Sequence, residues 1–163
     1  SNSELLDTFW YCESSRPFDS DNHSKPVGGL LGFYCEDKHF EKFYKKPSMW
    51  AERLVEEDWF AVVEPDYSTY SDWPHAKRLW SVYRSRWVCR YWQELGIKII
   101  PILRRTNNIR EDAPWLYNTL PADKCSIMAM QLRMGGVKNR DDPDYWKSIR
   151  KSLHYARDNL GLK

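Results

Sequence analysis

The stretch AKRLWSVYRSRWVCRYWQELGIKIIPIL, residues 76–103, reads as a long helix followed at once by an apolar strand. Gly96 stands at the junction, and glycine ends helices readily because it adopts a left-handed backbone without a steric penalty. The pattern predicts a helix over 74–95 and a strand over 97–103. A strand that follows a helix with almost no linker indicates an α/β fold.

The same alternation of strands and helices extends along the rest of the chain. Further strands are predicted at 30–37, 59–66 and 124–136, and further helices at 39–46, 47–58 and 141–163, with a short turn or helix at 112–121. Strands that are apolar throughout are typical of a sheet covered on both faces. We therefore expect a single α/β domain over residues 30–163, with a mainly parallel sheet of about four strands and helices on both faces. Residues 1–29, rich in Ser, Asp, Pro and Gly from residue 13 onward, predict an N-terminal arm or loop.

Composition limits the classes of function. The chain of 163 residues carries a net charge of only +2, so any basic surface for a polyanion must be local. Its four cysteines are dispersed without a CxxC pair or a zinc-type spacing, and we expect them to be reduced, with no metal bound. No apolar run is long enough to cross a membrane and no signal peptide opens the chain, which predicts a cytoplasmic protein without a membrane partner.

The predicted long helix concentrates aromatic and basic side chains. At about 100° per residue, one broad face carries Ala76, Leu79, Trp80, Tyr83, Trp87 and Tyr91. This face is the natural core side, with Arg84 and Arg86 at its opposite margins, roughly 200° apart by the same rotation. Two alternatives remain: the face could stack on the bases of single-stranded nucleic acid, or it could bind a protein.

The carboxyl ends of the predicted strands supply candidate ligand-binding residues. In open parallel sheets, ligands bind beyond these ends. The first strand ends at Asp37, the second at Asp66, Tyr67 and Ser68, and the third at Arg104 and Arg105. Two carboxylates could hold a divalent cation, and arginine matches phosphate oxygens in a fork. The same groups could equally form a salt-bridge network, and Asp66 could simply begin a loop.

Familiar catalytic motifs are absent. The sequence contains no glycine-rich phosphate loop, no GxSxG, no HExxH and no GxGxxG after a strand, and its four histidines are scattered. The sequence therefore predicts neither a catalytic residue nor a cofactor.

Four segments occur together in an order and spacing that identify a resemblance: FYCEDKHFEKFYKKP, VVEPDYSTYSDWP, LWSVYRSRWVCRYWQELGIKIIP and WLYNTLP. From about Leu31 to Gly136 the chain resembles a domain family of unknown function that is frequent in bacterial genomes, phages and plasmids. The resemblance matches Asp37 to an acidic residue that ends the first strand and Arg84 and Arg86 to an Arg-x-Arg motif. It implies an α/β core and a mobile-element origin, without a known reaction or substrate.

Three functions follow as expectations. The first is a phage-type or mobile-element protein that binds a phosphate-bearing ligand, nucleic acid or nucleotide, at the carboxyl rim of the sheet. In it Asp37 and Asp66 orient the ligand or a cation, Arg84 reinforces Asp66, and Arg104 and Arg105 contact phosphate. The second is a protein-binding module that acts on a host or phage partner. The third is a metal-dependent hydrolase or nuclease that uses the same two carboxylates.

Overall fold

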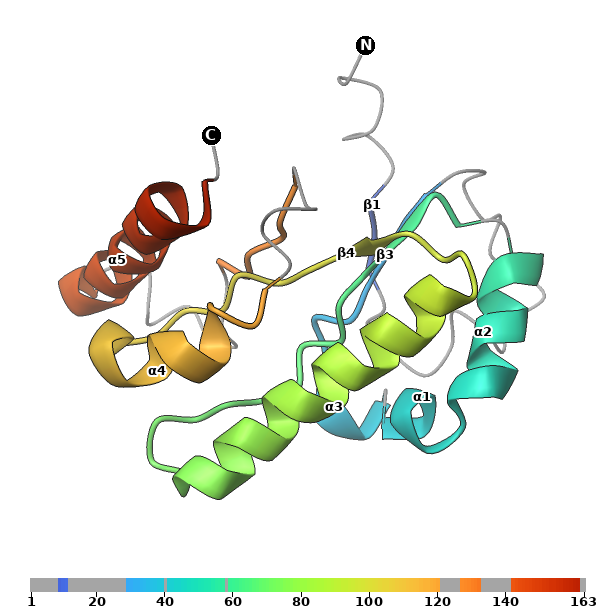
Figure 1. Cartoon of the computed structure of the whole chain (residues 1–163), viewed down its shortest axis with the longest axis horizontal. Coiled ribbons are helices and arrows are strands. Elements are labelled where there is room, and N and C mark those ends of the chain that lie inside the picture. Colours follow the sequence, from blue (N-terminus) through green and yellow to red (C-terminus); the bar gives the residue numbers. More distant parts are fainter. Residues whose placement is uncertain are drawn as a thin grey trace, which may run out of the picture. The chain divides into compact units, whose positions relative to one another are not determined.

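The computed structural model describes residues 9–11, 29–39, 41–57, 59–120, 127–132 and 142–161. The chain forms two compact units, Ser1–Ile100 and Pro101–Lys163. The first unit holds a small parallel sheet and its covering helices, so the α/β class predicted from the sequence is confirmed (Figure 1).

The sheet of the first unit contains the strands β1 (Phe9–Tyr11), β2 (Leu30–Gly32), β3 (Ala61–Val63) and β4 (Ile99–Ile100). They pair in parallel in the order β1-β2-β3-β4. The strands β2, β3 and β4 lie within the predicted ranges. The strand β1 falls in the segment predicted as an arm or loop, because a strand of three residues leaves too short a pattern to recognise.

The fourth predicted strand is not confirmed. Its described part, residues 127–132, makes one isolated parallel bridge, between Ala129 and Ile102. The Leu103 N–H donates to the Ala129 carbonyl at 2.8 Å, and the Ala129 N–H donates to the Pro101 carbonyl at 2.9 Å. Proline has no N–H to donate, so Pro101 interrupts any ladder at this point.

Most helices lie within the predicted ranges, but the turn or helix predicted at 112–121 begins at Ile109 and ends at Leu116. The helices are α1 (Glu41–Lys45), α2 (Pro47–Glu56), α3 (His75–Glu94), α4 (Ile109–Leu116) and α5 (Pro143–Leu160), with a 3-10 turn η1 (Asp37–His39) before α1. Pro47 and Pro143 occupy first-turn positions, where the absent N–H costs nothing. Gly96 and Gly161 follow α3 and α5 with φ of 88° and 68°, the left-handed conformation expected of glycine at helix ends.

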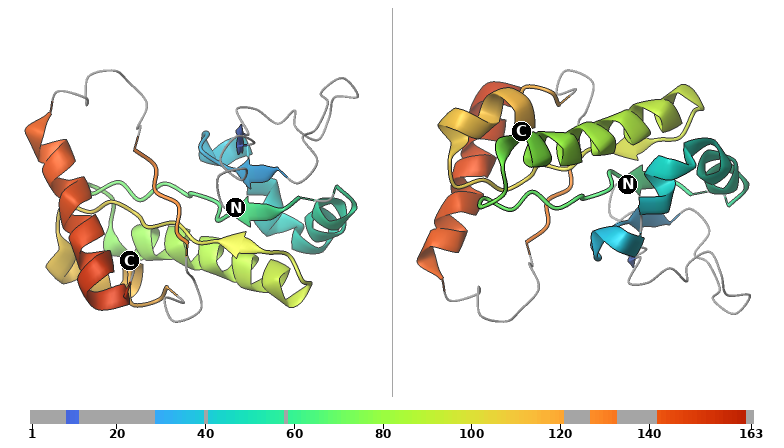
Figure 2. Two further views of the ribbon diagram at one scale, coloured as in Figure 1. Left: turned by 90° about the horizontal axis from the view of Figure 1, so that it is seen from above. Right: turned by 90° about the horizontal axis from the view of Figure 1, so that it is seen from below.

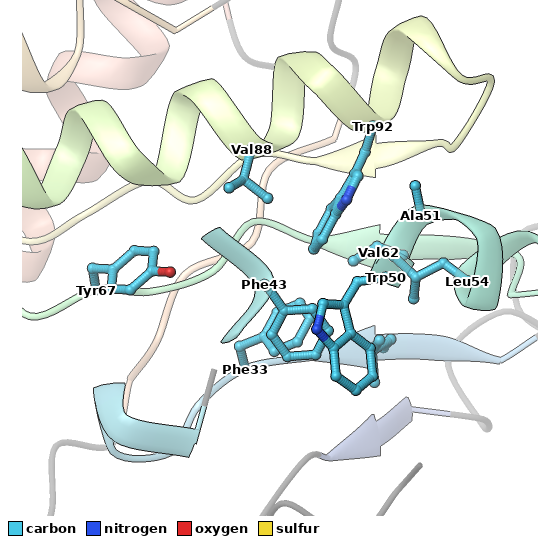
Figure 3. Packing of buried hydrophobic residues seen from close by; sticks show 10 residues of the cluster. Phe33, Phe43, Trp50, Ala51, Leu54, Val62, Tyr67, Val88 and Trp92 are labelled. Carbon is cyan, nitrogen blue, oxygen red and sulfur yellow. The ribbon is translucent and has the colours of Figure 1, made fainter. Parts of the chain in front are cut away.

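The core of the first unit lies on one face of its sheet. Leu31 and Val62 are register partners on β2 and β3, so their side chains share a face. Both belong to a cluster with Phe43 of α1, Trp50 of α2 and Trp92 of α3 (Figure 3). All the described helices of this unit therefore contribute to the covering of this one face, whereas the sequence predicted helices on both.

The orientation of α3 was predicted wrongly. Figure 2 shows β4 running back along this helix, and the buried residues of the helix lie on the opposite side from the one expected. The buried residues are Ser81, Val82, Ser85, Val88, Cys89 and Trp92. The predicted core face instead leaves Trp80 and Tyr83 47% and 51% exposed. Small serine and cysteine side chains let the helix approach its neighbours closely, and bulky aromatics do not.

The second unit has a buried polar centre. The Tyr117 hydroxyl donates to the Arg104 carbonyl at 2.7 Å and lies 2.7 Å from Ser152 Oγ of α5. Thr106 bonds to the Asp112 carboxylate, and all of these side chains are buried. Across both units, no described helix combines the length and apolar character that a membrane crossing needs.

Candidate functional site

The ends of β2 and β3 are joined by a carboxylate. Asp37, at the start of η1, accepts the backbone N–H of Ser68 at 3.1 Å and its hydroxyl at 2.9 Å. The topology thus brings two of the predicted site residues together, as expected for the carboxyl ends of neighbouring parallel strands. Charge-assisted hydrogen bonds of this kind hold a loop firmly. In the structure, Asp37 therefore anchors the loop after β3.

Tyr67 and Arg84 form a second contact at the same edge. Tyr67 is fully buried in the core, and the Arg84 guanidinium lies 4.1 Å from the centre of its ring. Arg84 Nη1 also donates to the Glu41 carboxylate at 2.7 Å. Burial raises the pKa of the Tyr67 hydroxyl, and the negative charge of Glu41 adds to this rise. The ion pair that the structure shows for Arg84 is thus with Glu41 of α1.

A buried carboxylate that the sequence analysis missed completes this edge. Glu64 follows β3 directly and is fully buried. Arg86 donates to one of its oxygens, and Ser85 Oγ lies 2.6 Å from the other. The signal for Glu64 was its place between VV and PD, where a charged residue interrupts an apolar strand. These contacts tie α3 to the end of β3.

The half-buried Asp66 occupies the turn between these groups, where the Tyr67 N–H donates to the Pro65 carbonyl at 3.1 Å. An i to i+2 bond of this type marks a γ-turn. In the part of the chain that the structure describes, no group of three or more His, Cys, Asp or Glu side chains is placed to hold a metal ion. The contacts described at this edge are hydrogen bonds and ion pairs between groups of the protein.

The exposed side of α3 carries an aromatic face, made of Trp80, Tyr83, Trp87 and Tyr91 together with Tyr44 of α1. Trp80 stacks on Tyr83 with ring centres 5.5 Å apart, and Trp87 stacks on Tyr91 at 5.7 Å. Tyr44 meets both tryptophans edge-on at 5.7 Å. The rings therefore form a continuous row in which Trp80, Tyr83 and Trp87 are exposed, while Tyr44 and Tyr91 also pack against the core cluster.

Basic residues border the aromatic face. The guanidinium carbon of Arg84 lies 5.8 Å from the centre of the Trp80 ring. Lys77 lies on the same side of the helix, two turns before Arg84. Arg90 borders the other side and pairs with Glu94 at 3.1 Å. Glu94 is the first carboxylate of α3, which carries five basic residues before it. The exposed side of this helix thus carries the basic residues Lys77 and Arg90 beside its aromatic rings.

The two remaining predicted residues belong to the second unit. Arg104 is buried, and its carbonyl accepts the Tyr117 hydroxyl. Arg105 is half-buried, and its Nη1 donates to Asn107 at 3.2 Å and to Ser148 of α5 at 3.0 Å. Of the two, only Arg105 lines a hollow in the surface of its unit.

Comparison with known proteins places this architecture in a family. The profile of the domain family described as "Domain of unknown function (DUF4417)" matches residues 10–153. The chain belongs to this family. Its resemblance to a phage-associated family is therefore confirmed, although DUF4417 assigns no activity.

Relatives among curated proteins come from phages. The chain is 40% identical over 74 residues to the "Gene 1 protein" of Mycobacterium phage L5 and 39% identical over 74 residues to that of Mycobacterium phage D29. The match covers 45% of this chain but only 31% and 27% of those proteins. No solved structure matches. The DUF4417 chain is thus a phage-type protein with mycobacteriophage relatives.

Proposed function

We propose that this phage-type domain binds single-stranded nucleic acid through the aromatic face of α3. The observation that carries the proposal is the exposed row of stacked rings: Trp80, Tyr83 and Trp87 are 47%, 51% and 39% exposed. Unpaired bases of any sequence can stack on such rings, whereas paired bases in a duplex cannot reach them. Packing of the unit does not require so many aromatic side chains with this exposed fraction on one helix, and a contiguous exposed apolar patch often marks a binding surface.

The charges around the face support an anionic partner. Lys77 and Arg84 border one side of the row and Arg90 borders the other, so a strand stacked on the rings would have its phosphates near cations. Arg84 is held by Glu41 and Tyr67, which orients its guanidinium before any ligand arrives. An oriented cation loses less entropy on binding than a mobile one.

The other residues predicted from the sequence remain proposals for the same class of ligand. Asp66 and Ser68 follow β3, close in sequence to the Tyr67 ring on which Arg84 lies. Through this contact, Arg84 joins the aromatic face to the edge of the sheet. We propose that Asp37, Asp66, Tyr67 and Ser68 shape the loop after β3 and that the Tyr67 ring in this loop positions Arg84 of α3. Direct phosphate contacts then fall to Arg84 and the basic residues of α3.

The experiment measures binding of the full chain to fluorescently labelled oligothymidine by anisotropy. Replacing Trp80 and Trp87 with alanine should weaken binding by roughly tenfold or more, because stacking contributes about 1–3 kcal/mol per base. Affinity should also fall steeply as salt concentration rises, since bound phosphates release counterions. Duplex DNA of the same sequence should bind more weakly.

A matched pair of tyrosines provides the control. Tyr70 is 50% exposed and Tyr83 is 51% exposed, but Tyr70 lies in the loop before α3, outside the row. Tyr83→Ala should weaken binding and Tyr70→Ala should leave it unchanged. Equal effects of the two substitutions, or an affinity independent of salt, would contradict the proposal and favour a protein-binding surface.

A further inference from the structure

The second unit contains a hollow of about 500 Å³ beside the first turns of α5. Its polar and aromatic lining includes Arg105, Asn107, Tyr145, Lys147, Ser148 and Lys151. Asp142 and Asp144 also line the hollow, and Asp142 accepts the backbone N–H of Asp144 at 2.9 Å and so caps the helix. A hollow of this size is suited to a small ligand rather than to a large surface.

Arg105 is held in a way that leaves part of its guanidinium unused. Both hydrogen bonds of the Arg105 guanidinium come from Nη1, which donates to Asn107 and to Ser148. The centre of the Tyr145 ring lies 4.9 Å from the guanidinium carbon. Its buried Nε finds no acceptor among the described residues. Arg84 and Arg86 each pair with a carboxylate, whereas Arg105 forms no ion pair with the carboxylates that the structure describes. A half-buried, oriented cation with an unsatisfied donor is the complement of an oxyanion.

We infer that this hollow is a phosphate-binding site centred on Arg105. The guanidinium supplies the unsatisfied Nε donor, and Lys147 and Lys151 supply two further cations one turn apart on α5, while Ser148 holds the guanidinium and donates its own hydroxyl to the Tyr145 carbonyl. This number of donors matches the several oxygens of a phosphate better than the two of a carboxylate. The phosphate can belong to a small molecule or to a nucleic-acid backbone. The site does not depend on the aromatic face, which lies in the other unit.

The test uses the full chain with arginine labelled by nitrogen-15. Titration with sodium phosphate at constant ionic strength should shift the Nε–H signal of Arg105 to a saturable end point, and sodium chloride should not. The signal is assigned by its loss in Arg105→Lys. Absence of a shift with phosphate, or the same shift with chloride, would overturn the inference.

Variants on α5 separate a site from general attraction. The double substitution Lys147→Gln and Lys151→Gln should weaken phosphate binding at least tenfold by calorimetry. Arg150→Gln removes an exposed charge of the same helix outside the hollow and should have no effect. Equal weakening by both would overturn the site. The exposed lysines can be replaced without disturbing the fold, so this comparison holds even if Arg105 variants do not fold.

The source of the phosphate and the independence of the two proposals are tested together. A nucleoside monophosphate that binds more tightly than inorganic phosphate indicates a small-molecule ligand, and tighter binding of oligothymidine with loss of the phosphate response indicates a nucleic-acid backbone. Either result supports the site. Tyr83→Ala should leave the Arg105 response intact, so failure of the aromatic face would not remove it. If Tyr83→Ala abolishes the shift of the Arg105 signal with phosphate, the hollow is not independent of the aromatic face.

Discussion

The two faces of α3 differ in a way that reverses the usual relation between polarity and burial. The buried face presents Ser81, Ser85 and Cys89 beside its apolar residues, and the exposed face presents a row of tryptophans and tyrosines. Close approach of a helix to a sheet requires small side chains, and a buried hydroxyl is tolerated when it has a partner. The comparison teaches that side-chain size and available partners, rather than hydropathy alone, decided which face of α3 is inside.

The largest expected effect comes from removing a tryptophan on each face. Trp92 is fully buried and its indole N–H donates to the Pro47 carbonyl at 3.2 Å, so Trp92→Ala should lower the free energy of unfolding by about 3–5 kcal/mol. Trp87 is exposed, and Trp87→Ala should cost less than about 1 kcal/mol. Urea denaturation followed by circular dichroism measures both. Similar losses would mean that the exposed row is part of the core.

The second unit extends the comparison to a buried hydroxyl that titrates. Burial raises the pKa of Tyr117 from the ordinary 10.0 to about 12, and the nearby Asp112 charge adds to the rise. Tyr117 keeps its proton in the folded state while the unfolded chain loses it above pH 10, so the free energy of unfolding should fall between pH 10 and 12. The fall should amount to roughly 2–3 kcal/mol.

Tyr117→Phe isolates this group from the other residues that titrate in alkali. The variant loses the hydrogen bond to the Arg104 carbonyl, so it should be less stable at neutral pH, but its stability should decline less steeply from pH 10 to 12. Tyr83→Phe, which changes an exposed hydroxyl, should follow the wild-type profile. Parallel profiles for wild type and Tyr117→Phe would show that Tyr117 ionises at its ordinary pKa when folded.

The sequence was informative wherever the signal is local. Pro47, Pro143 and Gly161 marked helix boundaries because their backbone restrictions act at the residue itself. The proximity of Asp37 and Ser68 was also predictable, because parallel strands bring their carboxyl ends to one edge. These features depend on chain geometry alone.

Features that depend on distant partners were not predictable from the pattern. Ser85 is buried because Glu64, 21 residues earlier, lies opposite it. Helical periodicity describes which residues share a face but not which face meets the sheet. The aromatic row could not be predicted for the same reason, because Tyr44 belongs to it but comes from α1, far from α3 in the sequence. The orientation of α3 was therefore the point at which sequence reasoning failed.

A smaller effect tests the polar contact on the buried face. Ser85 Oγ lies 2.6 Å from the Glu64 carboxylate and 2.5 Å from the Pro65 carbonyl. Ser85→Ala should lower the free energy of unfolding by about 1–3 kcal/mol, because it removes a partner from a buried charge. Ser81→Ala removes the buried serine hydroxyl one turn earlier, which has no carboxylate partner in the described segments, and should cost less. If urea denaturation gives the same loss of unfolding free energy for both variants, the contact between Ser85 and Glu64 contributes little to stability.

The smallest effect is expected at Arg84, which lies on the margin between the two faces. Its guanidinium makes two contacts: it pairs with Glu41, and it lies 4.1 Å from the centre of the Tyr67 ring. Arg84→Lys keeps the charge but loses the planar group, so stability should fall by only about 0.5–1 kcal/mol. The matched change Arg90→Lys alters an exposed arginine paired with Glu94 and should be neutral within about 0.5 kcal/mol.

The same two variants distinguish support of the fold from contact with a ligand. Arg90→Lys and Arg84→Lys both preserve charge, so both should keep the salt dependence of oligothymidine binding. Only Arg84→Lys should weaken the affinity itself, because lysine cannot hold the oriented donor between Tyr67 and Trp80 that the guanidinium provides. If Arg84→Lys lowers stability while affinity stays at the wild-type value, Arg84 serves the buried face alone, and the phosphates of a bound strand contact Lys77 and Arg90 instead.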